Sequence, residues 1–481
     1  MSLRLKQYPA MKDSGVPWLG EVPVHWGIRR QRNAVQMFVS TVDKHVAEGE
    51  ATVRLCNYVD VYKNDRITGG ISFMRATASA EEIERFRLRV GDVIITKDSE
   101  AWNDIGVPAL VEYTAPDLVC GYHLAILRPH DGILLGSYLL RALQCQGVAF
   151  QFHVSANGVT RYGLSHDAIK SVLIPVPPLV EQAAIVRFLD RADRRIRRFI
   201  AIERRLIELL NEQKQAIIQQ AVTRGLDPNV CLKPSGIGWL GSVPVDWVTK
   251  PAKYFLREID ERSSTGTEEL LSVSHITGVS PRSQKNVTMF MAESYIGHKI
   301  CCSGDLVINT MWAWMGALGV SKQTGIVSPS YAVYRPWHPE AFAPVFLDHL
   351  LRIAPYVSEF ICRSIGIRSS RLRLYPGEFL KIPLIQPSRE DQERIIHTVQ
   401  QQTRKLDAAI VRANREIDLI REYRTRLIAD VVTGKLDVRG VDLPPMEGTE
   451  GPALLGDEIP DDATEEGDEL EPVEETTDAV S

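Results

Sequence analysis

Long apolar runs and paired cysteines are both missing from this sequence of 481 residues. No run of 18 or more apolar residues occurs, which argues against a membrane-spanning helix. The N-terminal segment has neither an apolar core nor a cleavage site, so we expect no secretory signal. The seven cysteines include no CxxC pair, which argues against a disulfide framework or a zinc ribbon. We therefore expect a cytoplasmic protein whose thiols are reduced and buried.

Linear signatures of catalysis are missing as well. A methyltransferase would need a Gly-rich cofactor loop and an Asn/Asp-Pro-Pro-aromatic motif, and neither occurs. The pair Gly434-Lys435 lacks the upstream glycine of a phosphate-binding loop. The sequence contains no HExxH motif, no close His/Cys cluster and no GxSxG motif. These absences predict that the chain holds no catalytic residue, no metal and no cofactor.

Basic residues are absent from the last stretch of the chain. Residues 441–481 contain 15 Asp and Glu and no Lys, Arg or His. Because the whole chain has a formal net charge of -5, the remaining 440 residues carry +10. A basic body suits a nucleic-acid binder, although an ordinary protein with a solvated tail would have the same charges. The Gly, Pro, Thr and acidic composition predicts that residues 438–481 form a disordered tail.

The chain contains an internal duplication. Residues 15–26, GVPWLGEVPVHW, return as residues 236–247, GIGWLGSVPVDW, with eight of twelve positions identical. Shorter matches follow in the same order: 91–96 with 304–309, 124–129 with 331–336, 174–175 with 382–383, 181–182 with 391–392, 222–223 with 432–433 and 226–227 with 436–437. The offset between matching positions settles at 210 residues, so the order of the matching segments is the same in both copies while the loops between them differ. We interpret the chain as one module written twice.

Each copy begins with a β-rich domain. Short apolar runs separated by Gly, Pro and Asn fill residues 15–178 and 236–387, which predicts mixed or mainly β structure. Runs at 92–96, 124–127 and 306–309 are the clearest strands. The expected fold class is α+β. The expected divisions are a first β-rich domain at 1–178, a long helix at 179–228, a second β-rich domain at 229–387, a second long helix at 388–437 and the tail at 438–481.

Each copy ends with a long helical segment. Residues 179–223 and 389–433 contain no Pro or Gly and are rich in Arg, Glu, Gln, Leu and Ile. A helix of about 45 residues would be roughly 65 Å long at 1.5 Å per residue. Helices of this length outrun a small domain, so we expect them to pack on each other.

An apolar spacing of four and three residues runs along both helices and predicts a shared seam. Both stripes carry polar residues at matching places, 193 with 403 and 214 with 424. We expect an antiparallel coiled coil with pseudo-two-fold symmetry; two unrelated helices, each lying on its own domain, are the alternative. The predicted seam residues are Leu189, Ile196, Ile200, Ile207, Leu210 and Ile217 in the first helix and Leu406, Ile410, Ile417, Ile420 and Leu427 in the second.

These motifs together resemble a known family. Residues 12–26, KDSGVPWLGEVPVHW, look like the entry segment of the specificity subunits (HsdS) of type I restriction–modification systems. Residues 174–182, IPVPPLVEQ, which lead into the first long helix, show the same likeness. The second copies, 236–247 and 382–392, repeat it, so that it extends over about 12–437. The order, duplication and spacing of the motifs identify the family, since no single motif is specific.

The resemblance implies two target-recognition domains that each read one half of a bipartite DNA site, with the helices as the spacer. It also implies partners, namely two adenine-N6 methyltransferase subunits and, in the full complex, two ATP-dependent restriction and translocation subunits. In that family the specificity subunit contributes sequence choice and scaffolding but no catalysis. The acidic tail departs from the family pattern.

Loops that follow the short strands are the candidate DNA-reading elements, because direct readout needs side chains that reach base edges. The first copy offers residues 96–104 and 157–162, and the second offers 309–315 and 366–373. The loops differ between the copies, as two domains that read different sequences require. The candidate DNA-binding residues are Lys97, Ser99, Asn103, Thr160, Arg161 and Tyr162 in the first copy and Thr310, Trp312, Arg368, Ser369, Arg371 and Arg373 in the second.

Tryptophans that recur in both copies point to scaffolding rather than to recognition, because the two domains should read different bases. These are Trp18, Trp26, Trp239 and Trp247. Loop packing is also an alternative role for Trp312 and Trp314. At the level of the whole chain, two other functions stay open: a coiled-coil scaffold that binds only proteins, and an enzyme whose active site has no linear signature.

Overall fold

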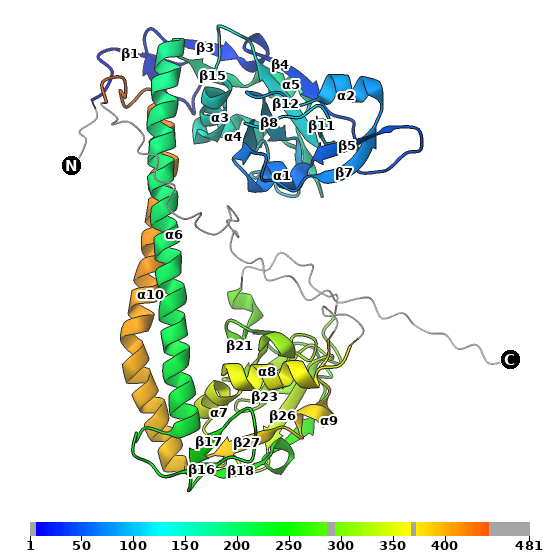
Figure 1. Ribbon diagram of the computed structural model, residues 1–481, viewed down its shortest axis with the longest axis vertical. Coiled ribbons are helices and arrows are strands. Elements are labelled where there is room, and N and C mark those ends of the chain that lie inside the picture. Colours follow the sequence, from blue (N-terminus) through cyan, green and yellow to red (C-terminus); the bar gives the residue numbers. More distant parts are fainter. Residues whose placement is uncertain (1–5, 286–293, 367–371, 442–481) are drawn as a thin grey trace, which may run out of the picture. The chain divides into compact units, whose positions relative to one another are not determined.

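The computed structural model describes residues 6–285, 294–366 and 372–441 (Figure 1). These residues form two compact units. Unit 1 contains the chain up to residue 204 and the residues from 414 onward, and unit 2 contains residues 205–413. Each unit combines one β-rich domain with one half of helix α6 (Leu179–Arg224) and one half of helix α10 (Arg389–Val432). The predicted α+β class is confirmed.

A five-stranded sheet with the order β4-β12-β8-β10-β6 forms the centre of the unit 1 domain. Strand β8 is buried at every position, because Val93 and Ile95 face the main core of the unit while Ile94 faces a second apolar cluster. Successive side chains of a strand point to opposite faces, so a sheet covered on both faces needs an unbroken apolar run. The strands are β4 (Val35–Val39), β6 (Arg66–Ile67), β8 (Val93–Thr96), β10 (Pro108–Val111) and β12 (Leu124–Pro129).

Smaller elements complete unit 1. The strands are β1 (Met11–Asp13), β2 (Glu21–Pro23), β3 (Gly27–Arg30), β5 (Ala51–Cys56), β7 (Met74–Ala78), β9 (Asp98–Ser99), β11 (Leu118–Cys120), β13 (Asn157–Gly158), β14 (Tyr162–Gly163) and β15 (Leu173–Val176). The helices are α1 (Tyr58–Lys63), α2 (Ala80–Phe86), α3 (Gly136–Gln144), α4 (Gln146–Ser155) and α5 (His166–Ser171), with a 3-10 turn η1 (Gln31–Asn33). Strand β15 pairs with β3 directly before α6 begins, which ties the start of that helix to the domain.

Unit 2 repeats this plan around a four-stranded sheet with the order β19-β26-β23-β24. Its strands are β16 (Leu232–Pro234), β17 (Ser242–Pro244), β18 (Val248–Pro251), β19 (Leu256–Ile259), β20 (Leu271–Ser274), β21 (Gly278–Pro281), β22 (Lys299–Cys301), β23 (Leu306–Ile308), β24 (Leu318–Val320), β25 (Gly325–Val327), β26 (Ala332–Pro336) and β27 (Pro383–Gln386). Its helices are α7 (Pro344–Leu351), α8 (Ala354–Arg363) and α9 (Pro376–Phe379), with 3-10 turns η2 (Ala252–Tyr254), η3 (Arg282–Gln284) and η4 (Ala313–Met315). Strand β27 pairs with β18 before α10, as β15 pairs with β3.

A buried aspartate–arginine pair recurs at the same place in both sheets. In unit 1 the Arg128 guanidinium donates to both oxygens of Asp92 at 2.8 and 2.7 Å. In unit 2 Arg335 donates to both oxygens of Asp305 at 2.9 Å each. The two carboxylates are 1% and 2% exposed, and such bidentate geometry compensates a buried carboxylate well. The matching segments of the sequence therefore have matching structures.

Each long helix has a buried glutamine in its first turn that fastens it to its domain. The Gln182 amide donates to the backbone oxygens of Ile133 and Pro177 and accepts from the backbone NH of Leu135, all at 2.9 Å. Gln392 makes the equivalent three bonds to Ala341, Pro387 and Ala343. Both glutamines are fully buried. The repeated acidic-Gln pair of the sequence is thus the joint between domain and helix.

The two ends of the described chain meet in unit 1. Lys6 forms an antiparallel bridge with Asp437, and Val438 is buried in the unit 1 core. The indole of the buried Trp26 donates to Glu181 at the start of α6. Residues 438–441 are therefore part of unit 1, whereas 442–481, the rest of the expected acidic tail, lie outside the described residues. In unit 2 the chain runs without a break from α6 into β16, so the same joint is covalent there.

The shared tryptophans do not all lie in the core. Trp26 and Trp247 are 1% and 4% exposed. Trp239 is half-buried and meets Tyr356 edge to face, whereas Trp18 is 43% exposed and packs against Phe150. The second tryptophan of each repeated segment is thus a core residue, and the first is a surface contact.

Helices α6 and α10 run antiparallel and lie side by side within each unit. In unit 1 the Arg424 Nε donates to Asp193 at 2.8 Å, and in unit 2 the Lys214 ammonium donates to Asp407 at 2.6 Å. In unit 1 a residue from the first half of α6 thus contacts a residue from the last part of α10. In unit 2 a residue from the last part of α6 contacts a residue from the first half of α10. All eleven predicted seam residues are buried or half-buried. The prediction of two long packed helices is confirmed.

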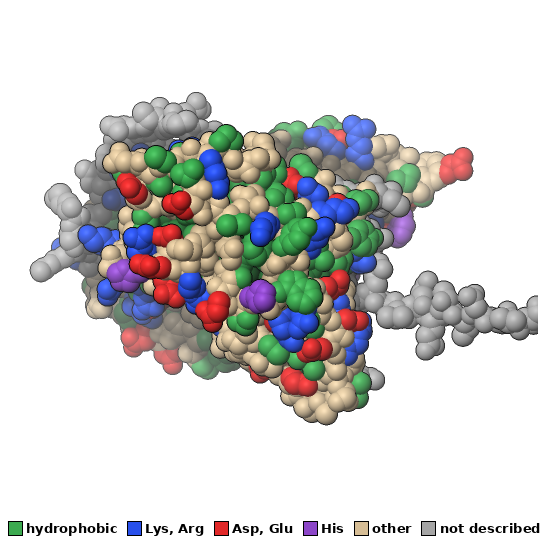
Figure 2. Space-filling model, turned by 90° about the horizontal axis from the view of Figure 1, so that it is seen from below, with side chains coloured by type: hydrophobic (Ala, Val, Ile, Leu, Met, Phe, Trp, Pro, Cys, Tyr) green, Lys and Arg blue, Asp and Glu red, His purple; other side chains and the backbone are tan. Residues whose placement is uncertain are grey.

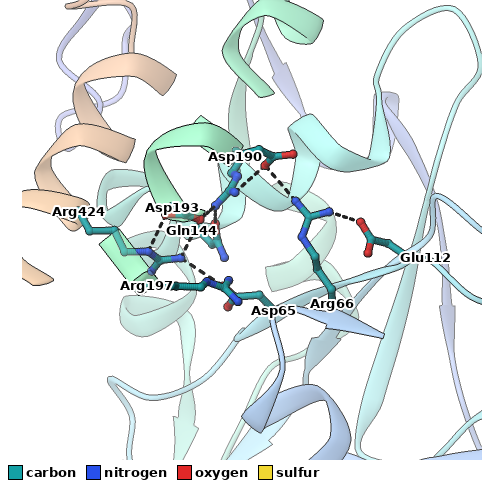
Figure 3. Close-up of polar contacts among 9 residues, drawn as sticks. Asp65, Arg66, Glu112, Gln144, Asp190, Asp193, Arg197 and Arg424 are labelled. Carbon is teal, nitrogen blue, oxygen red and sulfur yellow. Dashed lines mark hydrogen bonds and ion pairs between the residues drawn. The ribbon is translucent and has the colours of Figure 1, made fainter. Parts of the chain in front are cut away.

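A network of ion pairs attaches the unit 1 domain to both helices (Figure 3). Arg141 of α3 is 2% exposed and contacts Asp190 at 2.6 Å and Asp193 at 2.5 Å, both on α6. Arg424 of α10 reaches Asp193 and also Asp65 of the domain, the latter at 3.2 Å. Further contacts join Arg66 to Asp190 and Glu112, Arg197 to Asp65, and Arg141 to Gln144.

Asp193 stays ionised within this network. Burial alone would raise its pKa, but the hydrogen bond from Arg424 and the charge of Arg141 lower the pKa below its ordinary value. A buried pair of this kind contributes little over an apolar substitute, yet removing one partner leaves an uncompensated charge. The network therefore fixes how the domain sits on the helices more than it adds stability.

The expectation of buried thiols is wrong for two cysteines. Cys231 and Cys362 are exposed, Cys302 is half-buried, and Cys56, Cys120, Cys145 and Cys301 are buried. Cys231 lies in the loop between α6 and β16, and Cys362 lies on the face of α8 opposite its buried aromatic residues. Within the residues that the structure describes, no helix combines the length and apolarity needed to cross a membrane.

Candidate nucleic-acid interface

The two loops predicted in unit 1 lie side by side. Strand β9 pairs with β14, and β14 pairs with β13, so that Ser99 is opposite Tyr162 in a three-stranded sheet. The backbone NH of Leu164 also donates to the carbonyl of Lys97 at 2.9 Å. Residues 96–104 and 157–162 thus form one surface, although about 60 residues separate them along the chain.

The candidate residues of this surface differ in how accessible they are. Asn103, Thr160 and Arg161 are exposed, and Tyr162 is half-buried. The Lys97 ammonium lies 3.4 Å from Asp98 and is 24% exposed. Ser99 is 6% exposed, and its hydroxyl accepts from the backbone NH of Ala101. As placed, Ser99 supports the loop, whereas Thr160 and Arg161 face solvent.

The structure adds residues to this surface that sequence reasoning missed. His123 has a left-handed backbone with φ of 70° and contacts Asp98 at 2.6 Å, and Tyr122 beside it is 47% exposed. The Tyr62 hydroxyl of α1 donates to Asp104 at 2.7 Å. Two of the loop's acidic side chains are therefore engaged within the domain. No signal in the sequence placed these residues here, because they come from the turn after β11 and from α1.

The two loops of unit 2 are joined in the same way. The backbone NH of Leu374 donates to the carbonyl of Thr310 at 2.9 Å, as Leu164 does to Lys97. Thr310 is 5% exposed, and its hydroxyl donates to the backbone of Ser330. Arg373 is exposed, while Arg368, Ser369 and Arg371 lie outside the described residues.

The unit 2 tryptophans pack within their own loop. Trp312 and Trp314 stack with ring centroids 5.9 Å apart and planes 19° apart. The Trp314 indole also donates to the backbone of Met311 at 2.8 Å. Both rings are half-buried. This geometry gives them a packing role and leaves base stacking to the exposed part of each ring.

A cavity of about 210 Å³ lies beside the joined loops of unit 2. Thr310, Arg373 and Lys299 line it together with Glu258, Ser330 and Tyr375. The mixture of cationic and hydrogen-bonding groups suits contacts to phosphates and base edges. Basic and acidic side chains are interspersed on the face shown in Figure 2, so no broad field of one sign covers it. In the described part of the chain no cluster of His, Cys, Asp and Glu could hold a metal ion.

Comparison with known proteins gives this arrangement its context. Residues 53–212 match the family model of the type I restriction modification DNA specificity domain, a segment that includes both unit 1 loops. The specificity subunit of the type I restriction enzyme MjaX, from Methanocaldococcus jannaschii, is 25% identical to this chain over 48% of the chain's length. The MjaVIII specificity subunit of the same organism is 23% identical over 66% of this chain and 73% of its own length. Over these segments the chain is similar to type I specificity subunits.

A solved structure shares the fold of this chain. That structure concerns complex assembly and conformational transition of the type I R-M system. It matches with a TM-score of 0.56 and 16% identity, over 86% of this chain and 99% of its own. The alignment with the MjaX subunit spans 52% of that relative, about half its length.

Proposed function

We propose that this chain recognises a bipartite DNA sequence for a type I restriction–modification complex, with one half-site read by the loop pair of each unit. One observation carries the proposal. In both units the predicted loops are joined by the same backbone hydrogen bond, from Leu164 to Lys97 and from Leu374 to Thr310, while the exposed side chains around it differ. One frame with two sets of contact residues is what two different half-sites require.

The exposed basic residues of the loops are the candidates for direct readout. Arg161 in unit 1 and Arg373 in unit 2 have the planar donor geometry that pairs with O6 and N7 of guanine. Each such contact discriminates against a wrong base by about 1–3 kcal/mol. Thr160 can bond to any base, while Lys97 suits phosphates, which set position rather than sequence.

The recognised site is expected to have a nonspecific gap. Two domains that address one face of B-DNA bind half-sites about one helical turn apart, near 34 Å or 10 base pairs. The duplicated long helices would keep that distance constant. The chain itself would supply sequence choice and no catalysis, in the cytoplasm where cellular DNA is reached.

The partners would be two adenine-N6 methyltransferase subunits, with two restriction subunits in the full complex. Besides its seam, α6 carries a second apolar stripe that is partly exposed. Phe199 and Ile202 of unit 1 are 36% and 54% exposed, and Leu206 and Leu209 of unit 2 are 43% and 46% exposed. Apolar residues in a row on a surface helix mark a binding face. We place a partner contact on this stripe.

The function is tested by mapping modified adenines across a genome in cells with and without this chain. The proposal expects modification at one split sequence, present only with the chain. A continuous site, or modification that does not depend on the chain, would refute bipartite recognition. If the chain binds its partners but no variant of its loops changes the modified sequence, it is a scaffold without DNA specificity.

The partner contact has its own measurement. Ile202→Ser should weaken binding of the methyltransferase subunit, because it removes the most exposed apolar side chain of the stripe. Val411→Ser, on α10 and 69% exposed, lies outside the stripe and serves as the matched control. Equal affinities for the two variants would move the contact elsewhere.

A further inference from the structure

A buried glutamine in unit 1 has no partner for its amide. Gln31, the first residue of η1, is 0% exposed. Neither its Nε2 nor its Oε1 forms a hydrogen bond within the described residues. Buried amides are nearly always satisfied by protein, by ordered water or by a ligand. We therefore expect the Gln31 side chain to bind a group that does not belong to the chain.

Gln31 and two basic residues line a small cavity. The cavity measures about 70 Å³ and is lined by Gln31, Arg32, Val35, Met37 and Lys170. One water molecule needs only about 10–15 Å³ on this measure, so the space admits a larger polar group. Neither the Arg32 guanidinium nor the Lys170 ammonium has an ion-pair partner in the part of the chain that the structure describes.

The duplicate half shows that the frame does not need these polar groups. The backbone NH of Gln31 donates to Val172 at 2.8 Å, and at the matching place in unit 2 Ala252 donates to Ile382 at 2.8 Å. Lys170 corresponds by the same offset to Leu380. An alanine and a leucine thus fulfil the structural role in unit 2. The amide and the ammonium of unit 1 are additions to a frame that is stable without them.

We propose that this cavity binds a phosphate group. Arg32 and Lys170 supply two positive charges, and the Gln31 Nε2 supplies a neutral donor at the buried end. Oxygens of a tetrahedral phosphate accept from all three, and a protonated phosphate oxygen or a water satisfies the Gln31 Oε1. The group comes either from free phosphate or from a DNA backbone, and only the second source rests on the proposed function.

The first test uses inorganic phosphate and no DNA, so its outcome does not depend on DNA recognition. The melting temperature of the full chain is followed while phosphate replaces chloride at constant ionic strength. We expect a saturable increase in wild type that is lost in Lys170→Leu and in Arg32→Ala. Lys253→Ala, which removes a cation at the unit 2 counterpart of Arg32, should keep the response. An identical response to phosphate and chloride in wild type would overturn the proposal.

Gln31→Ala separates a ligand site from a hydrated core defect. It should raise the melting temperature in phosphate-free buffer, because it removes two unsatisfied buried groups, and should abolish the response to phosphate. An intact phosphate response in this variant would refute the role of the amide. This variant also keeps the net charge, so that a lost response reports a lost contact.

The second test distinguishes the sources. If a DNA phosphate occupies the cavity, Lys170→Leu should weaken DNA binding at every sequence alike and lower the salt slope by about one unit. If only free phosphate binds, DNA affinity and salt slope stay as in wild type. If phosphate has no effect but Gln31→Ala weakens binding of the methyltransferase subunit, a protein carboxylate occupies the cavity, and the proposal is wrong.

Discussion

The contacts that join each domain to the long helices differ between the two units in the residues that form them, although the backbone plan is the same. Unit 1 buries Arg141 between two carboxylates of α6, and Arg424 of α10 completes the network. The offsets of the duplication place His349, Thr403 and Lys214 at the positions of Arg141, Asp193 and Arg424 in unit 2. There Lys214 pairs instead with Asp407 on the facing helix.

The difference shows that the charges of unit 1 form a set that must be complete. Burial lowers the pKa of His349, with Asp348 opposing this effect and Lys214 and Arg352 adding to it. A neutral imidazole needs no carboxylate, and position 403 is accordingly a threonine. Where the cation is retained as Arg141, both Asp190 and Asp193 accompany it. We therefore expect either complete set to be more stable than a mixture of the two.

The largest expected effect is that of a variant that combines residues of the unit 1 set with residues of the unit 2 set. Asp193→Thr introduces the unit 2 residue alone and deprives Arg141 and Arg424 of their shared carboxylate. Arg141 keeps Asp190, but because it is 2% exposed, water cannot replace the lost second carboxylate. We expect the free energy of unfolding to fall by about 3–5 kcal/mol in chemical denaturation.

Completing the exchange should reverse most of this loss. The quadruple variant Arg141→His, Asp193→Thr, Arg197→Asp and Arg424→Lys carries the unit 2 residues, including the counterpart of Asp407, the partner of Lys214. Asp418→Thr, which removes an exposed carboxylate from α10, should shift stability by less than about 0.5 kcal/mol. A quadruple variant as unstable as Asp193→Thr would show that the two joints are not interchangeable.

The loop pairs are compared through their exposed arginines. Arg161→Ala should relax the sequence preference within one half-site, and Arg373→Ala within the other, by about 1–3 kcal/mol each. Sequencing of methylated sites, or competition binding with single-base variants, measures the change. Each variant is the control for the other, and an effect of either on both half-sites would contradict the assignment of one half-site to one unit.

The smallest expected effect is a pH dependence in unit 2. Because the folded-state pKa of His349 is lowered, the unfolded chain binds the proton more readily, and stability falls as the pH drops below about 6.5. His349→Gln should flatten the free energy of unfolding between pH 7 and 5. His338→Gln, at an exposed position, should leave the slope unchanged. Asp193 acts at lower pH, since its lowered pKa gives stability that is lost only as the pH falls below about 3.9.

The long helices were predictable almost to the residue. The expected 179–223 and 389–433 correspond to Leu179–Arg224 and Arg389–Val432. Pro and Gly are excluded from the interior of both segments, so composition alone marks their ends. The polar slots of the seam, such as 193 and 424, were also visible. Periodicity could not show that Arg141 enters from α3, because it reports on one element at a time.

The loop surfaces were predictable only in part. Strand ends and residue types pointed to 96–104 and 157–162, but pairing between β9 and β14 is a contact over long sequence separation. The positions of His123 and Tyr122 depend on a turn from a different strand pair. For the same reason the burial of Ser99 and the exposure of Cys231 were not foreseen, since both depend on packing between distant segments.

The bridge between Lys6 and Asp437 makes unit 1 a joint assembled from two chain ends, while the equivalent joint of unit 2 is unbroken. The molecule thus contains the same joint twice, once assembled from two separate segments and once as a continuous chain. It follows that covalent continuity is dispensable at this point of the architecture. A circularly permuted gene that joins residue 437 directly to residue 6 and begins a new chain after residue 227 would encode the same set of contacts in a different order.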